Sequence, residues 1–167
     1  MVGLAPQSMA VDVIAAKINQ LISISRKRFC KRSIDATTGK QIIQSPTTRP
    51  KKGIGWEVTT TSGTSEIALA KHLKQTGAKI YIMYTCPHCY KQKQLFGNEA
   101  IQHLNVIECL PDGKNSQTKL CTEAKIDSVP AWNINGKFYA GEQSLQKLAD
   151  LSGYQGDRNF LYMLLDD

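Results

Sequence analysis

The chain has 167 residues, 41% of them hydrophobic, and a formal net charge of +7. This length suits one packed domain with extensions, and no apolar run is long enough for a transmembrane helix. The charge is uneven, because residues 1–56 hold ten Lys/Arg and two Asp, whereas residues 57–167 hold eleven Lys/Arg and twelve Asp/Glu. The nearly neutral larger part therefore offers no electrostatic reason to bind nucleic acid.

Residues 1–56 are predicted to form a basic N-terminal extension. Apolar residues recur at three- and four-residue spacing over 9–24, which predicts an amphipathic helix. The basic run RKRFCKR follows and contains Cys30, which we expect to be a free surface thiol. Two further elements precede the main domain: a short hairpin at 33–44 that turns at Thr38-Gly39, and a linker at 45–55 rich in proline, glycine and basic residues.

Four interpretations of this extension stay open. The basic run is a solvated charge cluster, part of a helix on a membrane surface, part of a transit peptide, or a nucleic-acid contact. The last is disfavoured, because Phe29 is the one aromatic residue among these charges. The N-terminus shows no signal-peptide pattern, so the chain as written is expected to be soluble and cytoplasmic.

Residues 57–156 show the clearest pattern of helices and strands. Thr64 or Ser65 is expected to cap the first helix, and Gly97 to end the second. The elements expected in chain order are a helix at 64–76, a strand at 78–85, a helix at 86–97, a short helix or its continuation at 98–104, a strand at 105–110, a helix at 116–126, a hairpin at 130–141 around Asn135-Gly136, and a helix at 142–153.

This order predicts an α/β fold. The first two strands are joined by a helix, so they should be parallel with a right-handed crossover, and the hairpin should add antiparallel strands. The expected product is a mixed sheet of about four strands with helices on both faces. Residues 157–167 form a short tail that is expected to pack on this domain.

The stretch CPHC, Cys86 to Cys89, opens the second helix and has three interpretations. It is half of a zinc site, a structural disulfide, or a redox centre. A zinc site needs two more ligands, and the other histidines, His72 and His103, lie on predicted helices. A disulfide across a two-residue gap closes too small a loop to restrain the unfolded chain much.

The redox interpretation accounts for more of the residues. Cys86 follows a strand and begins a helix, whose N-terminus stabilises a thiolate. His88 adds a donor or charge beside it, and Cys89 lies one turn along, where it can resolve a mixed disulfide. Pro87 occupies the first helical position, where its missing N–H costs nothing. Two cysteines spaced in this way at a strand–helix junction are typical of thioredoxin-like redox proteins.

A proline about forty residues later belongs to the same pattern. Val129-Pro130 begins the strand PAWNIN, and a proline there can simply mark a sheet edge. In thioredoxin-like folds the equivalent proline is cis and faces the active-site cysteines, which leaves backbone groups free to pair with a substrate peptide. We therefore expect a cis peptide bond before Pro130.

Cys109 and Cys121 form a second pair with its own alternatives. They are two buried free thiols, a disulfide that ties a strand end to the next helix, or a relay that passes a disulfide to the first pair. The disulfide is favoured, and it would point to an oxidising compartment.

Several short motifs now make a family resemblance specific. They are CPHC, QKQLFG, IEC followed by PDGKN, the LC of the next helix, INGK and KLADLSGY. Over about residues 58–154 the chain resembles the thioredoxin-like domain that is fused to vitamin K epoxide reductase homologues of cyanobacteria and plants. In that family the membrane part makes disulfides with a quinone, and the thioredoxin-like domain carries them to secreted or lumenal proteins.

The resemblance implies a role for each cysteine. Cys86 would be the nucleophile that meets the substrate and Cys89 the resolving cysteine. Cys109 and Cys121 match the family's second pair, which supports a disulfide between them, and Pro130 matches the proline that faces the site. The family's location in the periplasm or thylakoid lumen is also implied.

The four- or five-helix membrane reductase of the family is not found in this sequence. The chain is therefore expected either to work with a separate membrane partner that reduces a quinone, or to be attached to a different N-terminal segment.

The predicted function is thiol–disulfide oxidoreductase, supporting disulfide bond formation and cell redox homeostasis. No metal and no cofactor besides the redox-active Cys86–Cys89 disulfide are expected, and the partners are protein thiols. The alternatives are a cytoplasmic reductase similar to glutaredoxin or thioredoxin, and a redox-inert peptide-binding module. No acidic residue occurs in the strand at 78–85, which favours an oxidant or isomerase over a general reductase.

Overall fold

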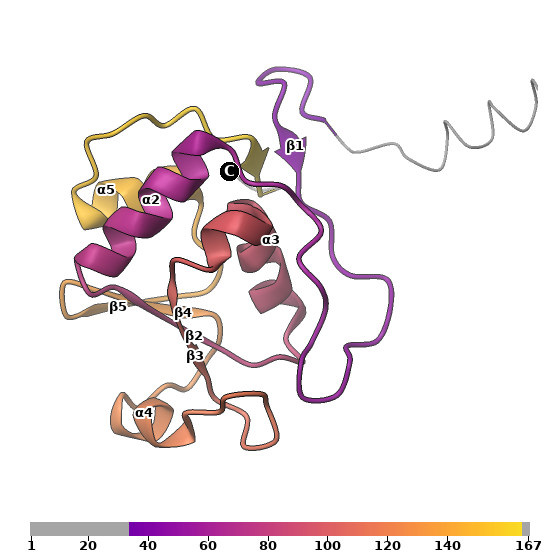
Figure 1. Ribbon diagram of the computed structural model, residues 1–167, viewed down its shortest axis with the longest axis vertical. Coiled ribbons are helices and arrows are strands. Elements are labelled where there is room, and N and C mark those ends of the chain that lie inside the picture. The colour runs from indigo at the N-terminus through magenta and orange to yellow at the C-terminus, as the bar shows by residue number, and fades with distance from the viewer. Residues whose placement is uncertain (1–33, 165–167) are drawn as a thin grey trace, which may run out of the picture. The chain divides into compact units, whose positions relative to one another are not determined.

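The computed structural model describes residues 34–164 and is drawn in Figure 1. From Ile34 onward the chain forms one compact unit. The helix predicted at 9–24 and the basic run at 26–32, with Cys30, lie outside the described residues.

The helices and strands follow the predicted order. They are β1 (Gln41–Ile42), α2 (Thr64–Gln75), β2 (Lys79–Ile82), α3 (Pro87–Ile101), β3 (Asn105–Glu108), α4 (Thr118–Glu123), β4 (Ala131–Ile134), β5 (Lys137–Ala140), α5 (Leu145–Ser152) and β6 (Tyr162–Met163).

The main sheet has the strand order β3-β2-β4-β5. Strands β2 and β3 are parallel, as their helical connection predicts, and β4 pairs antiparallel with both β2 and β5. The β4–β5 hairpin turns through Asn135 and Gly136, which have φ values of 52° and 77°. Two successive positive φ values define the type I′ turn that an Asn-Gly pair favours. This mixed sheet flanked by helices is a thioredoxin-like fold.

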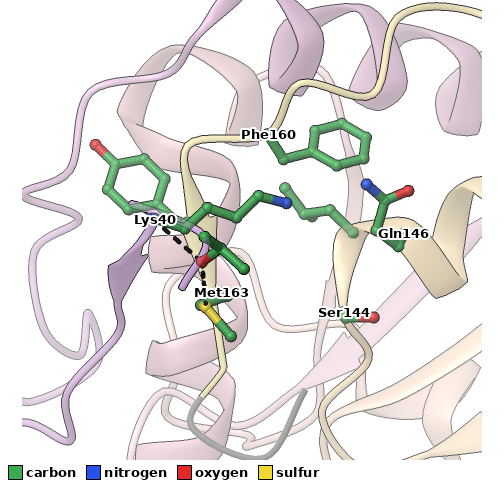
Figure 2. A pocket seen from close by; sticks show the side chains of 8 residues that line it. Lys40, Ser144, Gln146, Phe160 and Met163 are labelled. Atoms are coloured by element: carbon green, nitrogen blue, oxygen red, sulfur yellow. Dashed lines mark hydrogen bonds between the residues drawn. The ribbon is translucent and has the colours of Figure 1, made fainter. Parts of the chain in front are cut away.

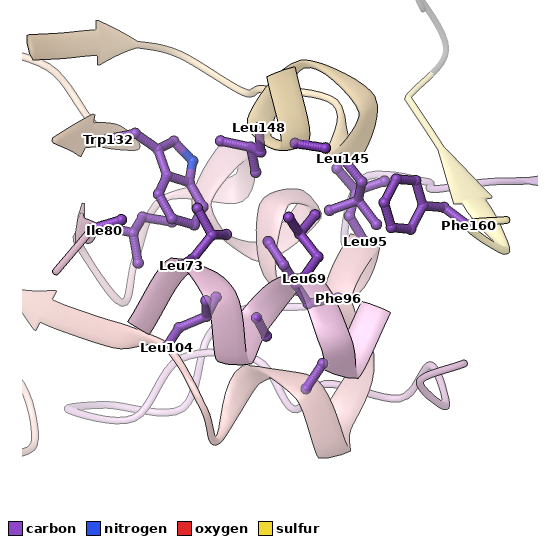
Figure 3. Packing of buried hydrophobic residues seen from close by; sticks show 14 of the residues in the cluster. Leu69, Leu73, Ile80, Leu95, Phe96, Leu104, Trp132, Leu145, Leu148 and Phe160 are labelled. Atoms are coloured by element: carbon purple, nitrogen blue, oxygen red, sulfur yellow. The ribbon is translucent and has the colours of Figure 1, made fainter. Parts of the chain in front are cut away.

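Alternating side chains of each strand face opposite sides of the sheet. Ile80 and Trp132 belong to the large core under α2, α3 and α5, where both are about 1% exposed. Tyr81 and Ile107 face a smaller cluster, which includes Cys121 of α4. Figure 3 shows Leu69, Leu73, Leu148 and their neighbours meeting in the larger core, and Figure 1 shows α4 apart from the other helices.

One predicted helix cap was wrong, because the N-cap of α2 is Gly63, without a side-chain capping bond, and not Thr64 or Ser65. Gly97 ends the first helical segment of α3 as predicted, since its φ of 82° and ψ of 171° are not helical, and the helix resumes beyond this kink as far as Ile101. A Cβ at Gly97 would lie 2.6 Å from the Ser62 hydroxyl and 2.7 Å from its backbone nitrogen. The close approach of this segment therefore requires glycine here.

The segments on either side of the predicted domain pack against it. Strand β1 pairs in parallel with β6, and Ile34 forms a bridge with Gln41 across the predicted hairpin. Phe160 and Tyr162 are buried, as expected for a tail that packs on the domain. The domain limits at 56/57 and 156/157 stay predictions, but the β1–β6 pairing links the two outer segments directly.

A cavity of about 320 Å³ lies beside this small sheet. Its lining includes Lys40, Ser144, Gln146, Phe160 and Met163, and Figure 2 shows the Lys40 side chain reaching across it. The lining contains no cysteine, histidine or acidic residue, so it lacks the side chains of a redox or metal site.

Candidate functional site

Cys86 stands at the junction predicted from the sequence. It is the N-cap of α3, and its Sγ accepts a hydrogen bond from the Cys89 backbone N–H at 3.3 Å. Pro87 occupies the first turn of the helix, where no backbone donor is lost. A sulfur in this position faces the free N–H groups and partial positive charge of the helix end.

Val129 and Pro130 lie against the first cysteine. The peptide bond between them is cis, as predicted, and the Cys86 thiol donates to the Val129 carbonyl oxygen at an Sγ–O distance of 3.5 Å. Cys86 is half-buried, whereas Cys89 is 1% exposed. A thiol arriving from solvent can therefore reach Cys86 and not Cys89.

The inner thiol is held in its protonated form. Burial raises the pKa of Cys89, and the neighbouring Cys86 acts in the same direction, while the Met83 backbone amide and the charge of Lys93 act against them. Both thiols are free in this structure. The arrangement gives the two cysteines different tasks, with an accessible outer sulfur and a shielded inner one.

The charge of Lys93 acts on the inner thiol, and Glu108 acts in turn on Lys93; the sequence reasoning missed both residues. The Glu108 carboxylate, 7% exposed, accepts from the Leu110 amide at 2.9 Å and the Tyr84 amide at 3.3 Å. Burial raises the pKa of Glu108, against these amides and the charge of Lys93. Burial lowers the pKa of Lys93, against the charges of Cys89, Glu108 and Cys86.

The sequence held a signal for Glu108. Side chains alternate along β3, so Glu108 lies on the same face as Val106, which packs against the large core. An acidic residue on that face is unusual and indicates a specific role. The sequence reasoning considered only the strand before the motif, which has no acidic residue, whereas Glu108 comes from β3.

His88 is tied to a residue of the β5–α5 loop. Its Nδ1 lies 2.5 Å from Oε1 of Glu142, and the same oxygen lies 2.8 Å from Nζ of Lys91. The His88 side chain is 66% exposed and that of Glu142 is 11% exposed. Glu142 therefore connects the first turn of α3 to the loop that follows edge strand β5, and the sequence held no local signal for it.

The second cysteine pair is separate in structure and in chemistry. Cys109 and Cys121 form a disulfide with a Cα–Cα distance of 5.8 Å, which ties the end of β3 to α4. Both residues are buried in the smaller cluster. A relay would need this disulfide to open, which its burial disfavours.

Neither a metal cluster nor a membrane span is found in the described part of the chain. Within residues 34–164, no group of three or more His, Cys, Asp or Glu side chains is placed to hold a metal ion. His72 instead lies 2.9 Å through Nε2 from the Ser152 carbonyl oxygen. In the same range, no helix has the length and apolar composition needed to cross a bilayer.

Comparison with known proteins finds a thiol–disulfide oxidoreductase. The chain is 44% identical over 105 residues to the thiol-disulfide oxidoreductase LTO1 of Arabidopsis thaliana. The match covers 61% of this chain and 28% of the relative's length, so the chain spans under a third of that protein. No protein-family model matches the chain. The chain is thus related in sequence to part of a thiol–disulfide oxidoreductase, over a region that folds like thioredoxin.

Proposed function

We propose that this protein exchanges disulfides with protein thiols through Cys86 and Cys89 of its CPHC motif. The observation that carries the proposal is the position of the Cys86 sulfur. It caps α3, accepts from the Cys89 amide at 3.3 Å and lies 3.5 Å from the Val129 carbonyl oxygen. An accessible sulfur at a helix N-terminus beside a second cysteine is the arrangement that thiol–disulfide exchange requires.

The reaction begins with Cys86 and Cys89 joined in a disulfide. A substrate thiolate attacks Sγ of Cys86, which forms a mixed disulfide and releases Cys89 as the leaving thiolate. The high pKa of buried Cys89 means that it takes up a proton as it leaves. A second substrate thiolate then attacks the substrate sulfur of the mixed disulfide, so the substrate is oxidised by two electrons and Cys86 and Cys89 are left reduced.

A partner must then reoxidise the pair. We propose a membrane protein that transfers the two electrons to a quinone, in line with the resemblance to the thioredoxin-like domain of vitamin K epoxide reductase homologues. This role belongs in an oxidising compartment such as a periplasm or thylakoid lumen, and the Cys109–Cys121 disulfide supports that setting. No cofactor besides the Cys86–Cys89 disulfide is needed for the exchange itself.

The function is tested with the full chain, oxidised beforehand with oxidised glutathione and mixed with a reduced protein substrate. We expect one substrate disulfide to appear for every two new enzyme thiols. Cys86→Ser should show no exchange, whereas Cys89→Ser should accumulate a mixed disulfide at Cys86. Peptide binding without any thiol exchange in the wild type would instead support a redox-inert binding module.

A further inference from the structure

The segment Arg49–Trp56 borders the redox site, although the sequence suggested only a linker. A Cβ at Gly55 would lie 2.7 Å from the Tyr84 carbonyl oxygen, and the Trp56 ring lies 5.7 Å from that of Tyr90. Tyr84 precedes Cys86 by two residues and Tyr90 follows it by four. In Figure 1 this purple loop runs beside the junction of β2 and α3, so a substrate that reaches the sulfur passes close to it.

Backbone contacts hold this segment in place. Gly55 donates to the Lys51 carbonyl oxygen at 2.8 Å, and Lys51 donates back to the Gly55 carbonyl oxygen at 3.0 Å. The Gly53 carbonyl oxygen accepts from the Lys114 amide at 2.6 Å. The shape of the turn thus depends on main-chain bonds and on glycines with positive φ, and not on the lysine side chains.

Those side chains form an exposed basic surface with an apolar centre. We call Arg49, Lys51, Lys52 and Lys114 the basic rim; all four are exposed, and none takes part in the ion pairs found within residues 34–164. Ile54, between them, is 60% exposed. Asp112, whose carbonyl oxygen lies next to Gly53, accepts from the Tyr84 hydroxyl at 2.8 Å.

We propose that the basic rim recognises acidic side chains next to the reacting cysteine of a protein substrate, with Ile54 covering an apolar neighbour. This rests on the proposed function and names its substrate class. The charges stand around one tight turn beside a reactive thiol, while residues 57–167 as a whole are nearly neutral. Such a local charge steers and orders an encounter, which suits a peptide segment better than a broad membrane or nucleic-acid surface.

The test uses the full chain, oxidised beforehand with oxidised glutathione, and two dithiol peptides. One peptide carries Asp and Glu beside its cysteines, and the other carries Asn and Gln at the same places. The single-turnover rate of peptide oxidation is measured for each. We expect the acidic peptide to react about tenfold faster at low salt, and the ratio to fall towards one as salt screens the charges.

Charge reversal locates the effect. In the double variant K51E/K52E, the rate with the acidic peptide divided by the rate with the neutral peptide should fall to one or below. The neutral double variant K51Q/K52Q should give a ratio between this value and that of the wild type. The matched control K71E/K74E makes the same change in net charge on exposed positions of α2, near the opposite end of β2 from Cys86. It should keep the wild-type ratio.

The experiment distinguishes a failure of the proposed peptide recognition from a failure of the proposed disulfide exchange. If the oxidised wild type converts neither peptide, the proposed function fails and the recognition surface with it. If both peptides react at equal rates and K51E/K52E changes nothing, the oxidoreductase stands and the rim has no role in recognition. Binding to phosphatidylserine-containing vesicles that K51E/K52E abolishes, without discrimination between peptides, would overturn the inference in favour of a membrane surface.

Discussion

The two cysteine pairs of this protein have opposite settings. Cys86 is accessible at the start of a long helix, with Cys89 one turn below. Cys109 and Cys121 are joined and buried between the end of β3 and α4. Under the proposed function, this difference in position decides which pair exchanges disulfides and which one braces the fold.

Removing the outer thiol should give the largest effect on activity. Cys86→Ser cannot form a mixed disulfide with a substrate, so oxidation of a reduced protein should fall to the uncatalysed rate. The double variant Cys109→Ala/Cys121→Ala is the matched control and should keep exchange activity while it stays folded. An active Cys86→Ser protein would mean that the second pair also exchanges.

Removing the bracing pair should give the largest effect on stability. Cys109 and Cys121 are 12 residues apart, and a disulfide closing a loop of this size stabilises by about 3 kcal/mol in the chain-entropy model. Cys109→Ala/Cys121→Ala should lower the free energy of unfolding in urea by about that amount. Unchanged stability would show that the disulfide does not brace the fold.

The buried carboxylate of Glu108 should make stability depend on pH. Burial raises the pKa of Glu108 above its unfolded value, so its contribution is fully present below the unfolded pKa and is lost as pH rises through the folded pKa. Glu108→Gln cannot ionise. Urea unfolding at a series of pH values should therefore show wild-type stability falling relative to Glu108→Gln, by less than the disulfide effect.

The control for this comparison is Glu57→Gln, at an exposed position, which should leave the wild-type pH profile unchanged. Lys93 and Asp112 also act on the Glu108 carboxyl, so the Lys93→Met variant should shift the midpoint of the pH effect upward. Parallel profiles for wild type and Glu108→Gln would contradict the raised pKa of Glu108.

Loss of the Glu142 contacts should give the smallest effect. Glu142 lies 2.5 Å from His88 and 2.8 Å from Lys91, and pairs near the surface contribute about 0–1 kcal/mol. Glu142→Gln should lower the free energy of unfolding within that range. Glu123→Gln, in the exposed pair with Lys119, should change it less, and a larger loss in Glu123→Gln would contradict the connecting role of Glu142.

Local patterns predicted the fold well, because its elements follow from short-range rules. The strand–helix–strand order and the Asn135-Gly136 turn each have a local cause, and so does the position of Cys86 at a helix start. The break in α3 at Gly97 was also predicted, but its contact with Ser62, far along the chain, was not. Such contacts leave no local pattern.

The same limit applies to the site. The spacing of Cys86 and Cys89 and the proline at 130 were visible in the sequence. Glu108 comes from another element, where its place on the buried face of β3 was an overlooked signal, whereas Glu142 is revealed only by the contacts of the β5–α5 loop with His88 and Lys91. The segment before Trp56 was predicted to be a linker from its glycines and prolines. Tight turns that pack on a domain have the same composition, so composition alone does not distinguish the two.

One measurement tests the contrast between the pairs most directly. The full chain is equilibrated in glutathione buffers, its thiols are alkylated, and each cysteine is quantified by mass spectrometry. We predict that Cys86 and Cys89 change state together at a potential between about −120 and −270 mV, while Cys109 and Cys121 stay oxidised to below about −300 mV. If both pairs were reduced together, or if Cys86 and Cys89 never formed a disulfide, the division between an exchanging and a bracing pair would be wrong.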